Sequence, residues 1–199
     1  MRVSYYLIGF LVIIVLIELV RGDFARIFFP DECIDSTYDI DFSRLAEEGK
    51  KGVIFDIDNT LVEHGFPADN RSIKLLHDIS ELGLKVVFLS NNKEPRVKSF
   101  KDAALPDADY IYKAGKPSKS GYLKACEIMG ITTEEAIFVG DQLFTDVWGA
   151  KRSGISNILV SPIDKHEEIQ IIIKRRLEYI VLAYYKRSKL YKKDLHKRV

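Results

Sequence analysis

Short apolar runs alternate with amphipathic stretches through the middle of the chain. The runs are rich in β-branched and aromatic residues, which predicts buried strands. They cover residues 53–55, 85–89, 110–112, 136–139 and 157–160. Apolar residues at helical spacing between the runs predict helices over residues 69–82, 94–100, 118–129 and 144–153. Alternating strands and helices are typical of a parallel sheet with helical crossovers, so we predict an α/β fold with a Rossmann-like core flanked by helices.

The start of the chain has a different pattern. Residues 3–20 are almost wholly apolar, and Glu18 is their only charged side chain. As a helix, this stretch would rise about 27 Å at about 1.5 Å per residue, close to the roughly 30 Å thickness of the hydrocarbon core of a bilayer. Arg21 and Arg26 follow it, which favours a body on the cytosolic side. We therefore predict a hydrophobic anchor helix over residues 1–22 at the inner face of the cytoplasmic membrane. A buried or interfacial helix is the alternative.

The end of the chain predicts an amphipathic helix over residues 167–185, followed by a basic tail. The apolar stripe of this helix contains Ile169, Ile172, Ile173, Leu177, Ile180, Val181 and Tyr184. After position 170, Glu178 and Asp194 are the only acidic residues among many Lys and Arg residues. This composition suits an anionic membrane surface. Two alternatives stay open: a helix that covers the sheet and carries a solvated tail, and contact with a nucleic acid backbone, which we do not expect.

These patterns divide the chain into four parts. They are an anchor over 1–22, a connector over 23–51, a core of alternating strands and helices over 52–165 and a basic helix with its tail over 166–199. The 30 basic and 29 acidic residues give a net charge of only +1, so the basic character is local to the last part. Nothing in the sequence indicates an oligomeric state.

Polar residues follow the predicted strands at the point where each strand ends. Asp56 and Asp58 come directly after the first strand, and Ser90, Lys116 and Asp141 come after later ones. The carboxyl ends of parallel strands share one edge of the sheet, and ligands bind in the crevice there. Asp56 and Asp58 alone would also fit a solvated turn after a strand. Together with the later residues, they predict a shared site.

The chemistry of these side chains indicates phosphoryl transfer. Several carboxylates at one edge, including Asp146 five residues beyond Asp141, favour a hard divalent cation, most simply Mg²⁺. A hydroxyl and an ammonium group favour an anion that has several oxygens. A phosphoryl group meets both demands, because an oriented carboxylate can attack it in line while a second carboxyl protonates the leaving oxygen.

Four segments resemble the motifs of haloacid dehalogenase-like phosphatases. They are Asp56-Ile57-Asp58-Asn59-Thr60, Ser90-Asn91, Lys116-Pro117 and the stretch from Gly140-Asp141 to Thr145-Asp146. The resemblance implies that Asp56 is a nucleophile that forms an aspartyl-phosphate. It implies that Asp58 is the general acid and base, and that its backbone carbonyl binds Mg²⁺ together with Asp56 and Asp141. Phosphate binding would then fall to Ser90, Asn91 and Lys116, with Thr60 and Asp146 as supporting residues.

A finer resemblance points to a substrate. The entry segment Phe29-Pro30-Asp31-Glu32 and the segment Tyr112-Lys113-Ala114 are similar to the YqeG-type branch of subfamily IIIA, which includes phosphatidylglycerophosphate phosphatases. The resemblance implies a phosphorylated lipid substrate that is converted to phosphatidylglycerol. His64 stands where this branch usually has Trp, and Gly115 stands where it usually has Arg.

The spacing between the motifs adds an independent argument. One helix and one strand fill each gap, which leaves no room for a lid domain, so we predict a capless, open crevice. Free metabolites usually need a lid that excludes water, whereas an open site suits a phosphate on a lipid surface or a macromolecule. The alternatives are a phosphatase acting on a nucleic-acid end or phosphoprotein, and a membrane-tethered scaffold without catalysis.

Overall fold

The structure, a computed structural model, describes residues 24–164 and 169–187. Its centre is a sheet of six parallel strands, in the order β1-β6-β5-β2-β3-β4. The strands are β1 (Glu32–Ile34), β2 (Gly52–Phe55), β3 (Lys85–Leu89), β4 (Asp109–Ile111), β5 (Ala136–Gly140) and β6 (Ser156–Val160). The α/β, Rossmann-like prediction is confirmed.

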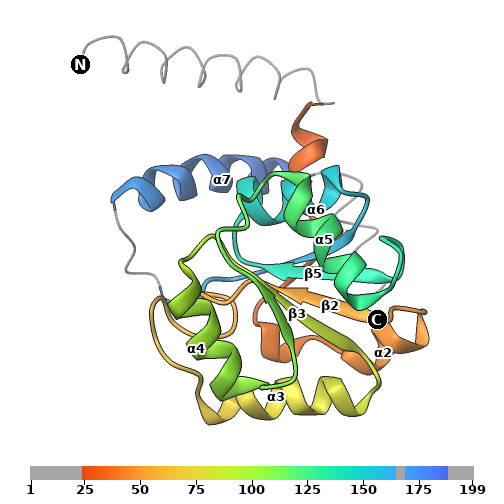
Figure 1. Ribbon diagram of the computed structural model, residues 1–199. Coiled ribbons are helices and arrows are strands. Elements are labelled where there is room, and N and C mark those ends of the chain that lie inside the picture. Colours follow the sequence, from red (N-terminus) through yellow and green to blue (C-terminus); the bar gives the residue numbers. More distant parts are fainter. Residues whose placement is uncertain (1–23, 165–168, 188–199) are drawn as a thin grey trace.

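Helices cover both faces of this sheet (Figure 1). They are α2 (Phe42–Glu47), α3 (Asn70–Glu81), α4 (Glu94–Ala104), α5 (Lys119–Met129), α6 (Trp148–Arg152) and α7 (Ile169–Arg187). Two short 3₁₀ turns, η1 (Phe24–Phe28) and η2 (Thr37–Asp39), lie near the start of the chain, and a π-helical turn, η3 (Leu143–Val147), precedes α6. In Figure 1, α3 and α4 lie below the sheet, α5 and α6 lie above it, and α7 crosses the upper side.

The central strand β2 separates two hydrophobic layers, because successive side chains of a strand point to opposite faces. Val53 and Phe55 belong to the layer that contains Leu76 of α3, while Ile54 belongs to the layer that contains Ala125 of α5. All three β2 side chains are completely buried. The uninterrupted apolar run of this strand therefore reflects burial on both faces of the sheet.

Local sequence signals determine where the helices begin and end, close to the predicted residues. Asp69 and Ser72 form a capping box at the start of α3: the Ser72 amide donates to Asp69 Oδ1 at 2.7 Å, and the Asp69 amide donates to Ser72 Oγ at 3.0 Å. Gly130 ends α5 with a φ of 64°, in the left-handed region that glycine tolerates. The helix predicted over 144–153 is instead a π-helical turn followed by α6.

The segment predicted as a connector is part of the fold. Its strand β1 pairs in parallel with β6 and forms one edge of the sheet. The prediction missed this strand because three residues are too few to show a period, and because β1 pairs with a strand more than a hundred residues away. A third hydrophobic cluster joins this part of the chain to α7, through Phe28 and Phe29 against Val181 and Tyr185.

The predicted anchor over residues 1–22 and the basic tail over residues 188–199 lie outside the described residues. In the described ranges, none of the helices is both long enough and apolar enough to cross a bilayer. The helix α7 lies in the region where we expected the C-terminal helix.

We expect the substitution Leu76→Ala to lower the free energy of unfolding by about 2–5 kcal/mol, because Leu76 is completely buried between α3 and the sheet. Leu82, which follows the same helix and is 42% exposed, is the matched control. The substitution Leu82→Ala should change stability by less than about 0.5 kcal/mol. Urea denaturation followed by circular dichroism measures both values, and equal effects would contradict the packing described above.

Candidate active site

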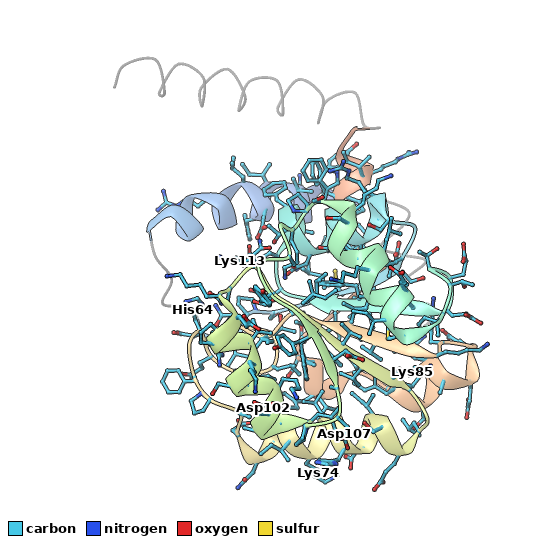
Figure 2. The ribbon with its side chains drawn as sticks, viewed as in Figure 1. His64, Lys74, Lys85, Asp102, Asp107 and Lys113 are labelled. Atoms are coloured by element: carbon cyan, nitrogen blue, oxygen red, sulfur yellow. The ribbon has the colours of Figure 1, made fainter. Side chains whose placement is uncertain are left out.

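The predicted site residues gather at the carboxyl ends of β2, β3 and β5. A cavity of about 220 Å³ opens there, lined by Asp56, Asp58, Asn59, His64, Ser90, Asn91, Asn92, Lys116, Gln142 and Thr145. In Figure 2, His64 and Lys113 lie on the opposite side of the molecule from Lys85, the first residue of β3. The sheet topology therefore brings side chains from four distant segments to one edge.

Lys116 lies between two buried carboxylates. Its Nζ atom is 2.9 Å from Asp56 Oδ1 and 2.8 Å from Asp146 Oδ1, and the lysine side chain is only 4% exposed. The loop that carries Lys116 is held by Asn91, whose Oδ1 accepts from the Lys116 amide at 2.8 Å and whose Nδ2 donates to the Lys116 carbonyl at 3.2 Å. The Asn91 side chain thus positions this loop through both of its polar atoms. The phosphate-binding role of Asn91 stays a prediction.

The segment after β5 brings Asp146 close to the sheet. The Gln142 amide donates to Asp146 Oδ2 at 3.0 Å. A Cβ atom at Gly140 would lie 2.6 Å from Asp146 Oδ2, so only glycine permits this approach of the carboxylate to the strand. Asp141 is also buried, and its Oδ1 lies 3.5 Å from Thr60 Oγ1. The π-helical turn η3 thus holds the Asp146 carboxylate against β5, in a cluster with Asp56 and Asp141, and such turns often lie at functional sites.

Burial and charge act in opposite directions on the central pair. Burial raises the pKa of Asp56 to about 6, although the Lys116 ammonium opposes this rise. Burial alone would lower the pKa of Lys116, but the Asp146 and Asp56 carboxylates raise it above its ordinary value. Lys116 is therefore protonated at neutral pH. A further positive charge beside Asp56 would favour the ionised carboxylate that a nucleophile requires.

The carboxylates fit a divalent cation. Oxygen atoms of Asp56, Asp141 and Asp146 all lie within 4.8 Å of one another, and all three residues are buried. One ammonium group cannot balance three carboxylates, so the site has an excess of buried negative charge and the oxygen ligands that hard cations prefer. The predicted ligands Asp56 and Asp141 belong to this cluster. The cluster contains Asp146, predicted as a supporting residue, and does not contain the Asp58 carboxylate.

Asp58 faces a different set of partners. Its Oδ1 accepts hydrogen bonds from the Gly65 amide at 2.7 Å and from Arg96 Nη2 at 2.8 Å. Its Oδ2 accepts from Asn92 Nδ2 at 2.7 Å. The two aspartates of the first motif therefore lie in separate environments, with Lys116 beside Asp56 and Arg96 beside Asp58.

The comparisons with known proteins agree with this geometry. A family model described as haloacid dehalogenase-like hydrolase matches residues 67–154. The "Probable phosphatase YqeG" of Bacillus subtilis (strain 168) is 38% identical over 165 residues, which cover 82% of this chain and 94% of that protein. This chain belongs to the haloacid dehalogenase-like hydrolases. It is a phosphatase, a phosphomonoester hydrolase, as the family and the relative indicate.

A second relative of this hydrolase is more distant. "Phosphatidylglycerophosphate phosphatase 1, chloroplastic/mitochondrial" of Arabidopsis thaliana is 29% identical over 161 residues, which cover 76% of this chain and 46% of that protein. A shorter match is 43% identical over 61 residues to the "Phospholysine phosphohistidine inorganic pyrophosphate phosphatase" of Xenopus laevis, covering 28% of this chain and 23% of that protein. Phosphatases of this kind generally depend on a divalent metal, which the carboxylate cluster described above would hold.

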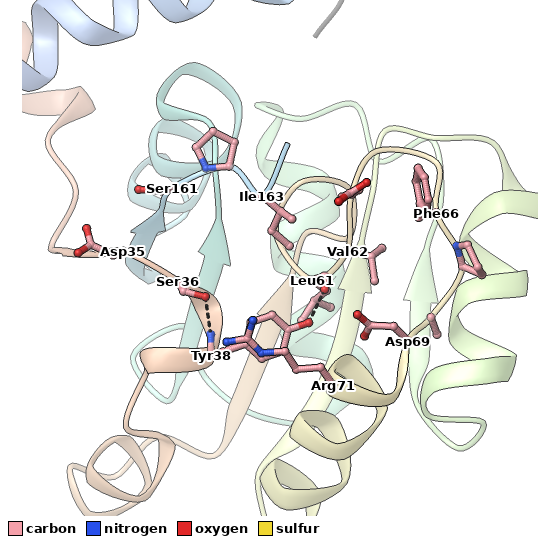
Figure 3. Close-up of a pocket in the computed structure, with 14 residues that line it drawn as sticks. Asp35, Ser36, Tyr38, Leu61, Val62, Phe66, Asp69, Arg71, Ser161 and Ile163 are labelled. Atoms are coloured by element: carbon pink, nitrogen blue, oxygen red, sulfur yellow. Dashed lines mark hydrogen bonds between the residues drawn. The ribbon is translucent and has the colours of Figure 1, made fainter. Parts of the chain in front are cut away.

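The 3₁₀ turn η2 of this hydrolase supports the loop of the first motif. Thr37 Oγ1 donates to the Thr60 carbonyl at 2.7 Å, and Tyr38 Oη donates to the Leu61 carbonyl at 2.5 Å. Figure 3 shows the Tyr38 bond at the wall of a second cavity, of about 430 Å³, where the Arg71 guanidinium lies 3.7 Å from the centre of the Tyr38 ring. Burial, with a smaller effect of Asp69, raises the pKa of Tyr38 to about 12, so the hydroxyl stays a donor.

The residues that contact the Asp58 carboxylate were not predicted from the sequence. Arg96, Asn92 and the Gly65 amide come from outside the motifs or from positions to which no role was assigned. One signal was present, because an Arg in the first turn of a helix opposes the helix dipole and such a placement often marks a functional site. Tyr38 and Thr37 had no comparable signal.

We expect Mg²⁺ at about 100 times its Kd to stabilise the folded protein by about 2.7 kcal/mol, since it would bind the native carboxylate cluster and not the unfolded chain. The substitution Asp141→Asn should remove most of this stabilisation, because it replaces one of the clustered carboxylates. Asp107, an exposed residue beyond α4, supplies the control Asp107→Asn. Thermal melts with and without Mg²⁺ measure the effect. An undiminished shift in Asp141→Asn would contradict the predicted cation site.

Proposed function

We propose that this phosphatase hydrolyses phosphatidylglycerophosphate to phosphatidylglycerol at an anionic membrane surface, with Mg²⁺ as its cation. The observation that carries the proposal is the match to the Arabidopsis phosphatidylglycerophosphate phosphatase, which extends over 76% of this chain. The site geometry adds support. In the described core, the segments between the strands that carry the site are short, and the crevice opens directly to the surface. A phosphate that projects from a bilayer could reach it without passing a lid.

In the proposed reaction, Asp56 attacks the phosphorus of the phosphomonoester in line. The new bond joins a carboxylate oxygen to phosphorus and forms an aspartyl-phosphate, while the bond from phosphorus to the leaving oxygen breaks. Lys116, protonated and 2.9 Å from Asp56 Oδ1, is placed to neutralise phosphoryl oxygens, and Ser90 Oγ is a further donor. The cation supplies charge neutralisation for the phosphoryl group when bound.

Asp58 has the second role in this proposal. It donates a proton to the leaving glycerol oxygen, and the resulting carboxylate then takes a proton from the water that attacks the aspartyl-phosphate. That attack breaks the bond between Asp56 and phosphorus and releases inorganic phosphate. The scaffold without catalysis is no longer in question, because the chain is a phosphatase.

We also propose that the protein is membrane-associated through the predicted anchor over residues 1–22. The outward side of α7 supports a surface role. Tyr179 is 74% exposed and Ile180 is 43% exposed, next to the exposed basic residues Arg176, Lys186 and Arg187. Exposed aromatic and aliphatic side chains beside basic ones suit the interface of an anionic bilayer.

Phosphate release should be faster from phosphatidylglycerophosphate in vesicles than from a 5′-phosphorylated oligonucleotide, a phosphopeptide or glycerol phosphate. We expect at least about a tenfold difference in kcat/KM for the lipid, about 1.4 kcal/mol of transition-state discrimination. The variant Asp56→Asn is the control and should release no phosphate from any of the four. A preference for the oligonucleotide or the phosphopeptide would replace the proposed substrate by that class. Activity in Asp56→Asn would show that the nucleophile is wrongly assigned.

Deleting residues 1–22 should sharply reduce the fraction of the protein that sediments with anionic vesicles. A variant that ends at residue 187 is the matched control, because it removes basic residues and keeps the apolar segment. We expect it to sediment nearly as well as the full chain at about 0.15 M salt, where exposed charges are screened beyond about 8 Å. If the deletion of residues 1–22 has little effect and the variant that ends at residue 187 no longer sediments, the basic tail and not the apolar segment makes the membrane contact.

A further inference from the structure

Arg96 forms an ion pair with Asp58, the aspartate that we propose to serve the leaving group. It belongs to the first turn of α4, which begins at Glu94, and its Nη2 lies 2.8 Å from Asp58 Oδ1. The Arg96 side chain is 19% exposed and the Asp58 side chain 9%, so solvent screens this pair only in part. Its guanidinium also lies 5.7 Å from the centre of the Phe100 ring, one helical turn further on.

Two features make this position of Arg96 unfavourable for stability. A basic side chain in the first turn of a helix faces the positive end of the helix dipole. Arg96 Nε is buried and has no hydrogen-bond partner within the part of the chain that the structure describes, and an unsatisfied buried donor is destabilising. Residues that break local rules in this way tend to lie at functional sites. The ion pair with Asp58 is therefore the contact through which Arg96 would serve a function.

The donors around Asp58 distinguish its two oxygens. Oδ1 accepts two N–H groups, from Gly65 and Arg96, whereas Oδ2 accepts one, from Asn92. A carboxylate has about four lone-pair positions, so Oδ1 is fully used and Oδ2 keeps one free. A proton on Asp58 therefore belongs on Oδ2. The planar guanidinium contributes a donor in a fixed direction, which resists rotation of the carboxylate.

We propose that Arg96 is a positioning residue that, with Gly65 and Asn92, holds the Asp58 carboxyl so that Oδ2 carries the proton to the leaving oxygen. The inference rests on the proposed role of Asp58 as general acid. In the first step the Oδ2–H bond breaks and an O–H bond forms on the leaving alcohol as its bond to phosphorus breaks. In the second step Oδ2 takes a proton from water. Arg96 itself keeps its charge and touches neither reacting oxygen.

A comparison of leaving groups tests this role, because only a poor leaving group needs the proton. The substitution Arg96→Ala should lower kcat/KM for glycerol phosphate, an alkyl ester, by about 100-fold, in the range of a lost general acid. The ratio kcat/KM reports the steps up to formation of the aspartyl-phosphate and leaves out the second step, which both esters share. The same substitution should lower kcat/KM for p-nitrophenyl phosphate, an aryl ester, by less than about threefold, because nitrophenolate leaves without protonation. Arg96→Lys should recover about tenfold on the alkyl ester, because it keeps the positive charge without the planar fork.

Two controls separate positioning from a structural effect. Arg152, an exposed arginine whose guanidinium lies 5.0 Å from the centre of the Trp148 ring, supplies the matched control Arg152→Ala, which should leave both rates unchanged. When Asp58→Asn is already present, adding Arg96→Ala should lower kcat/KM for the alkyl ester by less than a further factor of about three. The effects of residues that act as a unit are not additive. Thermal melts identify any variant that fails to fold. If Arg96→Ala does not fold, Arg96→Lys is compared with the unsubstituted protein on both esters instead.

The outcomes distinguish this inference from the function on which it rests. If Arg96→Ala lowers kcat/KM equally for both esters, or for neither, Arg96 does not position the acid and the inference is wrong. If Asp58→Asn lowers kcat/KM by the same factor for the alkyl ester and for the aryl ester, the proposed role of Asp58 as general acid is wrong. The role of Arg96, which depends on it, is then wrong too. Neither outcome bears on which lipid is the substrate, because both esters are soluble and contain no lipid.

Discussion

The buried ammonium of Lys116 is the contact on which the rest of the site depends. It lies within 3 Å of oxygens from Asp56 and Asp146, so three charged groups meet out of water. Burying such charges costs several kcal/mol for each ion, and removing one partner from a buried pair typically costs about 3–5 kcal/mol. Asp56 follows β2, Lys116 follows β4 and Asp146 follows β5. The site therefore forms only when these strands stand in register, which couples the chemistry to the sheet.

The rest of the molecule holds the loops that carry these charges. Asn91 fixes the backbone at Lys116, and Gly140 leaves room for the Asp146 carboxylate against β5. On the outer side, Tyr38 donates to the first-motif loop. The buried Glu178 of α7 accepts from the Phe144 amide at 3.2 Å, at the start of η3. Helices and turns that are distant along the chain from the site residues thus determine where the carboxylates of the crevice lie. Contacts of this kind give a site its preorganised geometry.

The separation of Asp56 and Asp58 shows how one strand end can serve two steps. Two like charges that are two residues apart would repel if they faced the same point. The structure gives each its own cation, Lys116 for Asp56 and Arg96 for Asp58. The first carboxylate joins the buried cluster with Asp141, and the second accepts hydrogen bonds from three donors. Different surroundings, rather than different side chains, separate the two roles that we propose, attack by Asp56 and proton transfer by Asp58.

From the sequence alone, the fold class, most strand and helix positions and the core of the site could be predicted. Apolar runs and helical spacing are local properties of the chain, and parallel strands bring Asp56, Ser90, Lys116 and Asp141 to one edge whatever the details. The tertiary structure decided what depends on distant contacts. These include the pairing of β1 with β6, the reach of Tyr38 to the first-motif loop, and the position of Arg96 beside Asp58. No local pattern encodes these contacts, because each joins residues whose proximity exists only after the sheet has formed.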